Sequence, residues 1–287
     1  MRYTLASCRS LTTQAAGLLL GALVIALPTL AAGPEPVPEL RPGILQGYLS
    51  QEDFPDSLAL LPPPPRDGSA AAKVDEELNA HLLTLQQTAR FELAALDNDL
   101  HFPEAAGTFA CALGIDISKE DTPYLYQLLR RSLTDAGLST YGAKNAYQRT
   151  RPFVVNGAPN CAPEREQELL KNDGSYPSGH TAIGWAWALI LTSIAPERAD
   201  ALLQRGMAYG ESRMVCNVHW PSDVAAGRIM GAAAVAVLQG NAAFQSDLAM
   251  AKQEIAAARG EESMPGRDCS VESSAITYEI YPAEADQ

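Results

Sequence analysis

The stretch YPSGHTAIGWAWALILTSI, residues 176–194, has the pattern of a helix that is buried on all sides. Ser178 has a side chain of the kind that caps the start of a helix, and residues Thr181 to Ile194 are almost entirely apolar. A helix that is apolar around its whole circumference belongs in the centre of a protein. Its first turn then presents free backbone amides and the positive end of the helix dipole beside Ser178 and Gly179.

A second apolar run, Val224 to Leu238, follows Pro221, a residue that favours the first turn of a helix. The run contains Arg228 and is shorter than the roughly 18 residues that a membrane-spanning helix needs. It is therefore predicted to form a second buried helix, which would make a central pair with the first.

Most of the remaining chain carries apolar residues at helical intervals, and no long stretch alternates with a period of two. The spacing from Ser69 to Leu96 predicts one long amphipathic helix. Further helices are predicted over Ser118–Gly137, Ser139–Arg149, Pro163–Lys171, Pro196–Tyr209 and Asn241–Ala258. The expected fold is an all-α, single-domain helical bundle with a buried central helix pair and no significant sheet.

Residues 1–31 have the order of a secretory signal peptide. Arg2 and Arg9 occur without any acidic residue, the apolar core Ala15–Leu27 follows, and small residues precede an expected cleavage after Ala31. The core is too short to span a bilayer, which disfavours the alternative of a membrane anchor. The sequence therefore predicts a periplasmic or secreted protein with no membrane attachment after cleavage.

The rest of the chain divides by composition into three parts. Residues 32–66 are rich in proline and are predicted to form an extended N-terminal arm. Residues 67–258 carry the helical periodicity and form the predicted functional domain, and residues 259–287 are an acidic C-terminal tail. We expect the tail to be flexible, pinned to the body by Cys269.

Charge and cysteine content limit the partners and the compartment. The net charge of −13 argues against a nucleic acid polymer as partner, because phosphate backbones are bound by basic surfaces. Four cysteines follow the signal peptide, which in an oxidising compartment allows two disulfides in any of three connectivities. Their spacing does not match a structural zinc site.

Three segments gather cationic and imidazole side chains. Lys144 and Arg151 are seven residues apart, which would place both on one face of a helix within reach of the same anion. Ser178 and Gly179 begin the apolar helix, where backbone amides can hold a phosphate. Taken alone, these two segments could equally be a solvated basic stripe and an ordinary turn.

The third segment contains His219, four residues before Asp223 near another helix start. A carboxylate there can accept a hydrogen bond from one imidazole nitrogen and leave the other as a nucleophile. The alternative is that Asp223 only caps its helix. The two other histidines of the chain, His81 and His101, lack such company and are predicted to lie at the surface.

Together the segments resemble the signature of the type 2 phosphatidic acid phosphatase superfamily, which includes the vanadium haloperoxidases. The signature reads Lys-x6-Arg-Pro, Pro-Ser-Gly-His and Ser-Arg-x5-His-x3-Asp. Its positions here are Lys144, Arg151, Pro152, Pro177, Ser178, Gly179, His180, Ser212, Arg213, His219 and Asp223. The segments around Leu61-Pro-Pro-Pro-Pro65, Gly174–Thr181 and Val218–Trp220 further resemble the class A bacterial nonspecific acid phosphatases.

The resemblance implies an acid phosphatase that hydrolyses a broad range of small phosphate monoesters through a phosphohistidine, without metal or other cofactor. In that scheme His219 attacks phosphorus, Asp223 orients it, and His180 protonates the leaving oxygen. The phosphoryl oxygens would be held by Lys144, Arg151, Ser178, Gly179 and Arg213. Phosphate transfer to alcohols and a homo-oligomeric state are further expectations.

Two other functions remain open at this level. The same motifs fit a vanadate-dependent haloperoxidase, and the anion site alone fits a phosphate-binding protein that does not hydrolyse its ligand. For the cysteines we favour Cys161 with Cys216, since each lies close in sequence to a predicted catalytic segment, and hence Cys111 with Cys269.

Overall fold

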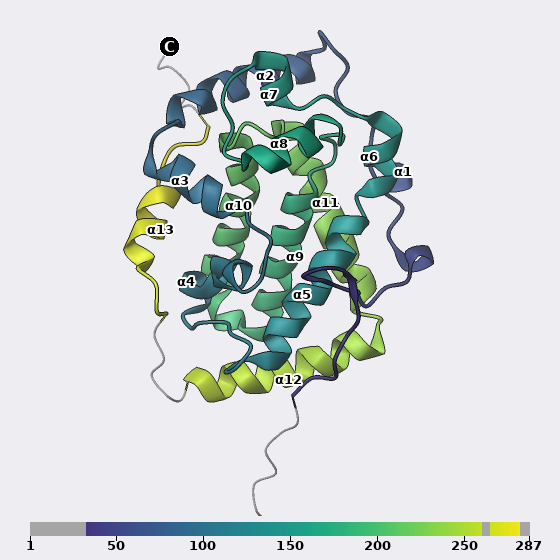
Figure 1. Ribbon diagram of the computed structural model, residues 1–287, viewed down its shortest axis with the longest axis vertical. Helices are drawn as coiled ribbons and strands as arrows, with labels where there is room; N and C mark the ends of the chain where they lie inside the picture. Colours follow the sequence, from purple (N-terminus) through teal and green to yellow (C-terminus); the bar gives the residue numbers. More distant parts are fainter. Residues whose placement is uncertain (1–32, 260–264, 282–287) are drawn as a thin grey trace, which may run out of the picture. The chain divides into compact units, whose positions relative to one another are not determined.

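The computed structural model describes residues 33–259 and 265–281, so the predicted signal peptide lies outside the described residues. Helices make up almost all of its regular structure (Figure 1). In chain order the elements are β1 Glu39–Arg41, β2 Ile44–Leu45, η1 Gln51–Asp53, α1 Ser57–Leu60, α2 Ala70–Leu82, η2 Leu83–Leu85, α3 Ala89–Leu96, η3 Glu104–Phe109, α4 Ala110–Leu113, α5 Pro123–Leu138, α6 Tyr141–Tyr147, α7 Pro152–Asn156, α8 Glu164–Lys171, α9 Gly179–Ile194, η4 Pro196–Arg198, α10 Ala199–Val215, α11 Pro221–Leu238, α12 Ala242–Arg259 and α13 Cys269–Ile276.

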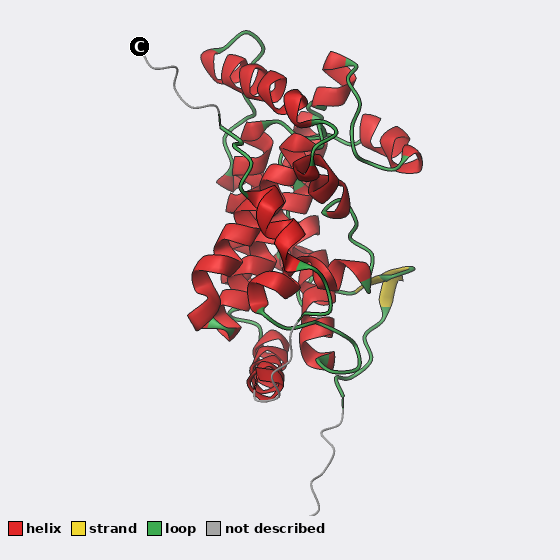
Figure 2. Cartoon of the chain, turned by 90° about the vertical axis from the view of Figure 1, so that its left-hand side faces the viewer, coloured by secondary structure: helices red, strands yellow, loops and turns green. Residues whose placement is uncertain are grey.

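Helix α9 lies at the centre, packed against α10, α11 and α5 (Figure 1). Trp187, fully buried on α9, donates a hydrogen bond from Nε1 to the carbonyl of Leu129 on α5, 3.0 Å away. In the part of the chain that is described, the only sheet is the short antiparallel pair β1–β2 (Figure 2). The predicted all-α fold with a buried central helix pair is confirmed.

Glycines allow the central helices to approach closely. A Cβ built on Gly231 of α11 would lie within 3.0 Å of the backbone of Ala182 on α9. A Cβ on Gly227, one turn earlier, would lie 2.5 Å from the carbonyl oxygen of Ser178. The starts of α9 and α11 can therefore lie side by side, and the Ser178 amide donates to the carbonyl of Asp223 at 3.0 Å.

The long helix predicted from Ser69 to Leu96 is two helices, so that prediction was wrong. Helix α2 ends at Leu82, a 3-10 turn follows, and α3 begins at Ala89. Gln87 between them has φ 66°, in the left-handed region that a helix cannot contain. The apolar spacing continues across the break because α2 and α3 both pack against the helical bundle. Periodicity alone therefore does not reveal that the chain changes direction.

The C-terminal segment was expected to be flexible, but it contains a helix, α13. Its first residue, Cys269, forms a disulfide with Cys111, and Cys161 pairs with Cys216. Both predicted pairs are thus confirmed. Ala275 of α13 is fully buried, and the helix packs against α3.

The predicted N-terminal arm is held to the helical body by backbone hydrogen bonds. The amides of Tyr48 and Leu49 donate to the two carboxylate oxygens of Asp135 on α5, at 2.9 and 3.0 Å. Burial raises the pKa of Asp135 to about 6, while these amides act in the opposite direction. The arm is therefore anchored near its middle, well before the proline run 62–65.

Among the described residues, one helix, α11, is long and apolar enough to cross a membrane by length and composition. Half of that helix is buried inside the protein, as the sequence predicted for a core helix.

We predict that Gly231→Ala lowers the free energy of unfolding by about 1–3 kcal/mol, because the added methyl group overpacks the contact between α9 and α11. Urea denaturation would measure the change. Gly240→Ala is the matched control, since the nearest atom to its Cβ would be 3.5 Å away in ordinary contact. Equal stability of the Gly231→Ala variant and the wild type would contradict the close packing.

Candidate active site

The start of α9 is the point around which the three sequence segments converge. Ser178 caps the helix, accepting from the Thr181 amide at 3.3 Å and from the Thr181 hydroxyl at 2.9 Å. Ser178 is fully buried, and the helix behind it is apolar. The free amides of the first turn therefore lie in a region of low dielectric, where they interact strongly with an anion.

His219 lies in the short loop between α10 and α11 and is buried. Its Nε2 is 3.0 Å from Nη1 of Arg151. A guanidinium group can only donate, so Nε2 is the acceptor and carries the lone pair. The other nitrogen, Nδ1, then carries the proton and faces Oδ2 of Asp223 at 3.4 Å.

Asp223 is itself held in place by two groups. Its Oδ2 accepts from the Trp220 amide at 2.8 Å, which caps α11, and its Oδ1 accepts from Arg149 Nη1 at 2.6 Å. Arg149 also donates to Asp75 on α2 at 2.7 Å. Asp223 therefore both caps its helix and faces His219, so the two interpretations of the sequence are compatible.

Lys144 and Arg151 do meet, but not on one helix face as predicted. Helix α6 ends at Tyr147, and Gln148 has φ 44°, so the chain turns before Arg151. The two cations meet instead at the loop before α9, where the Gly174 carbonyl accepts from Lys144 Nζ at 2.5 Å and from Arg151 Nη2 at 3.3 Å. The Asp173 carboxylate lies 3.5 Å from the lysine and 3.0 Å from the arginine.

Arg213, on α10, is fully buried, and none of its three guanidinium nitrogens has a hydrogen-bond partner among the described residues. An unpaired buried cation is costly unless an anion compensates it. This side chain is the clearest indication in the described residues that the site is built for an anionic ligand.

His180 is the second residue of α9 and is partly buried. Its Nε2 is 3.1 Å from the backbone carbonyl of Asn98, which follows α3. A carbonyl only accepts, so Nε2 carries a proton and Nδ1 is the nitrogen that can gain or lose one. After burial, the positive charges of Arg213, His219 and Arg151 lower the pKa of His180, which is consistent with His180 lying near these groups.

Burial and the crowding of cations shift the pKa values of the site downward. Burial, with Arg151 acting in the same direction, lowers the pKa of Lys144 to about 8, and burial lowers the pKa of Arg213 to about 10. Burial also holds the pKa of His219 well below its usual value, assisted by Arg151 and Lys144. For His180, burial and then Arg213 lower the pKa.

These shifts have a common consequence. A bound dianion would raise the pKa of each basic group, so anion binding and proton uptake are coupled. The site is thus expected to bind its ligand more tightly as the pH falls. Burial raises the pKa of Asp223, but Arg149 opposes the change, which favours the carboxylate that His219 needs.

Every site residue predicted from the sequence lies in this region. The sequence interpretation missed Arg149, whose guanidinium donates to Asp223 in the structure. It also missed the supporting groups Asp75, Asp173 and the Asn98 carbonyl, for which only the structure provides a signal. No three His, Cys, Asp or Glu side chains of the described residues group together as metal ligands would.

Comparison with known proteins agrees with this arrangement. The PAP2 superfamily profile matches residues 125–242. The chain is 46% identical to the non-specific acid phosphatase of Providencia stuartii, over 73% of this chain and 84% of that one. It is 42% identical to that of Salmonella typhimurium, over 74% and 84%, and 40% identical to the acid phosphatase of Zymomonas mobilis, over 77% and 83%. The chain therefore belongs to the PAP2 superfamily, among the bacterial non-specific acid phosphatases.

Proposed function

We propose that this acid phosphatase hydrolyses small phosphate monoesters in two in-line steps at His219. The observation that carries the proposal is the orientation of His219, whose Nε2 accepts from Arg151 while Nδ1 faces Asp223. In the first step Nε2 attacks phosphorus and the ester P–O bond breaks. The proton on Nδ1 stays opposite the Asp223 carboxylate, which stabilises the positive charge on the ring.

His180 serves as the acid and then the base. In its protonated form it gives the Nδ1 proton to the departing alcohol oxygen, while Nε2 stays bonded to the Asn98 carbonyl. In the second step a water attacks phosphorus, His180 takes one of its protons, and the P–N bond breaks. Inorganic phosphate and neutral His219 are the products.

The basic groups hold the nonbridging oxygens while negative charge spreads over them. Arg213 supplies a buried guanidinium that has no hydrogen-bond partner in the described part of the chain, and Lys144 and Arg151 supply two more cations near His219. The amides that follow Ser178, with Gly179 allowing close approach, complete the cradle. In this scheme the protein cations take the place of a metal ion.

The relatives named as acid phosphatases favour hydrolysis over the two other functions considered from the sequence, haloperoxidation and binding without turnover. The predicted signal peptide and the two disulfides support a periplasmic or secreted location. We further propose that the protein forms a homo-oligomer, acts without membrane attachment and does not bind a nucleic acid polymer.

We predict that His219→Ala loses at least about 10³-fold in kcat for nitrophenyl phosphate, since the nucleophile is removed. Alkaline quenching with labelled substrate should trap phosphohistidine in the wild type and none in the variant, with excess EDTA changing neither result. His101→Ala, at an exposed histidine, is the control and should behave as wild type. If the His219→Ala variant still became labelled with phosphate, His219 would not be the nucleophile.

We predict that His180→Ala slows alkyl phosphates more than nitrophenyl phosphate, because only poor leaving groups need protonation. General acid catalysis contributes about 10²–10⁴-fold, so the two losses should differ by about that factor. Steady-state kcat values on both substrates measure the difference. Equal losses on the two substrates would argue against the acid role.

We predict that inhibition by sulfate weakens as the pH rises through about 8, the value to which the pKa of Lys144 is lowered. The sulfate dianion needs the protonated amine, so losing one proton weakens binding by up to about tenfold per pH unit. Sulfate keeps a constant charge between pH 7 and 9, so the change reports on the protein.

In the same range Lys144→Met should bind sulfate more weakly and with little dependence on pH. Lys171→Met, at an exposed lysine of α8, should keep the wild-type profile. An unchanged profile in the Lys144→Met variant would assign the titration to another group.

A further inference from the structure

The C-terminal segment 265–281 is built into the body of the protein although it lies outside the region that the superfamily profile matches. The Cys111–Cys269 disulfide fixes the start of α13, and the Gly266 amide donates to Asp116 Oδ2 at 2.8 Å. Beyond the helix, Ile280 is buried in a hydrophobic cluster with Val215 and Cys216, at the end of α10. This segment therefore touches the helix that carries Arg213.

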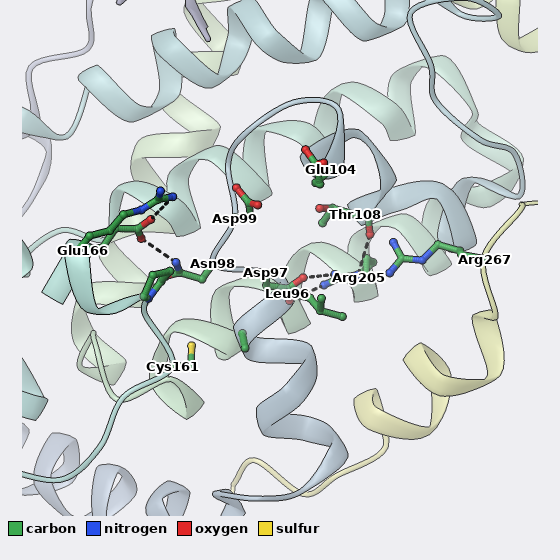
Figure 3. A pocket seen from close by; sticks show the side chains of 13 residues that line it. Leu96, Asp97, Asn98, Asp99, Glu104, Thr108, Cys161, Glu166, Arg205 and Arg267 are labelled. Carbon is green, nitrogen blue, oxygen red and sulfur yellow. Dashed lines mark hydrogen bonds and ion pairs between the residues drawn. The ribbon is translucent and has the colours of Figure 1, made fainter. Parts of the chain in front are cut away.

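Glu272 of α13 is 6% exposed, and its Oε2 lies 3.3 Å from Nε of Arg205 on α10. Arg205, itself 2% exposed, forms a two-pronged ion pair with Asp97 at the end of α3 (Figure 3). Asp97 also accepts from the hydroxyl of Ser212 at 2.6 Å. A continuous chain of buried polar contacts thus runs from the C-terminal helix to the residue that precedes Arg213.

Glu272 adds a second carboxylate to this cluster. Arg90, also fully buried, donates to Ser212 at 2.9 Å, so two guanidinium groups lie near the carboxylate of Asp97. Arg205 forms ion pairs with both Asp97 and Glu272. Without Glu272, Arg205 would keep Asp97 as its one ion-pair partner among the described residues, in a region where incompletely compensated charge is costly.

The other end of the chain of contacts reaches His180. Asp97 is followed directly by Asn98, whose backbone carbonyl is 3.1 Å from His180 Nε2. The Asn98 side chain is fixed as well, donating to Glu166 at 2.9 Å (Figure 3). Because that carbonyl selects the tautomer and the direction of the His180 ring, its position decides where the catalytic proton lies.

We propose that α13 is a positioning element of the active site, and that Glu272 is a positioning residue that acts through Arg205 and Asp97 on the Asn98 carbonyl. The ion chain holds the end of α3 against α10, and the carbonyl then holds His180 for proton transfer to the leaving group. This inference rests on the proposed function of His180 as the general acid.

The test compares kcat on ethyl phosphate and nitrophenyl phosphate for the wild type, Glu272→Gln, Glu279→Gln and His180→Ala, with thermal melting of each protein. Glu279→Gln makes the same chemical change at an exposed residue of the same segment. Glu272→Gln is expected to lose about tenfold on ethyl phosphate and less than about threefold on nitrophenyl phosphate, a part of what general acid catalysis supplies. Glu279→Gln should match the wild type on both.

Equal losses on the two substrates, or no loss on either, would overturn the proposal even if melting shows a less stable protein. If His180→Ala itself fails to discriminate between the substrates, the acid role of His180 is wrong, and that failure is separate from a failure of Glu272. If Glu272→Gln does not fold, the double variant Cys111→Ala, Cys269→Ala removes the disulfide that fixes the start of α13 and keeps the Glu272 carboxylate in the chain. It should show the same selective loss on ethyl phosphate, and an unselective loss would overturn the proposal.

Discussion

The close contact between the starts of α9 and α11 is the constraint on which the rest of the site depends. The Ser178 amide donates to the Asp223 carbonyl, and Gly227 lets the two backbones approach without a side chain between them. Through this contact the cradle of amides at one helix start lies next to the imidazole and carboxylate at the other. The faces by which these two apolar helices meet are buried, so the packing that stabilises the fold also fixes the distance between the catalytic segments.

The site concentrates positive charge in a chain that is acidic overall. At the edge of the site Asp173 faces both Lys144 and Arg151, whereas the guanidinium nitrogens of Arg213 have no hydrogen-bond partner within the described residues. Such an arrangement costs stability until an anion binds. It also makes the ligand the missing partner, so the binding energy is directed at the group that reacts and not at the rest of the substrate.

Much of this could be predicted from the sequence, because helix type and burial follow from local pattern. The apolar run after Ser178 was sufficient to place α9 at the centre. The sequence could not show the break at Gln87 or the turn at Gln148, since backbone direction at those residues is determined by distant contacts. For the same reason the sequence predicted that Lys144 and Arg151 meet on one helix face. They do meet, but across a turn and not on one helix.

The tail was misjudged for a related reason. Its acidic composition is typical of a solvated segment, yet Glu272 is buried and forms an ion pair with Arg205. Only the folded chain shows which cation pairs with this carboxylate. The Cys111–Cys269 bond joins residues 158 positions apart. A chain that ended during synthesis just before this helix would contain every residue of the superfamily signature. It would still lack α13 and the side chains that α13 buries against the body. The presence of the whole signature therefore does not show that the folded enzyme is complete.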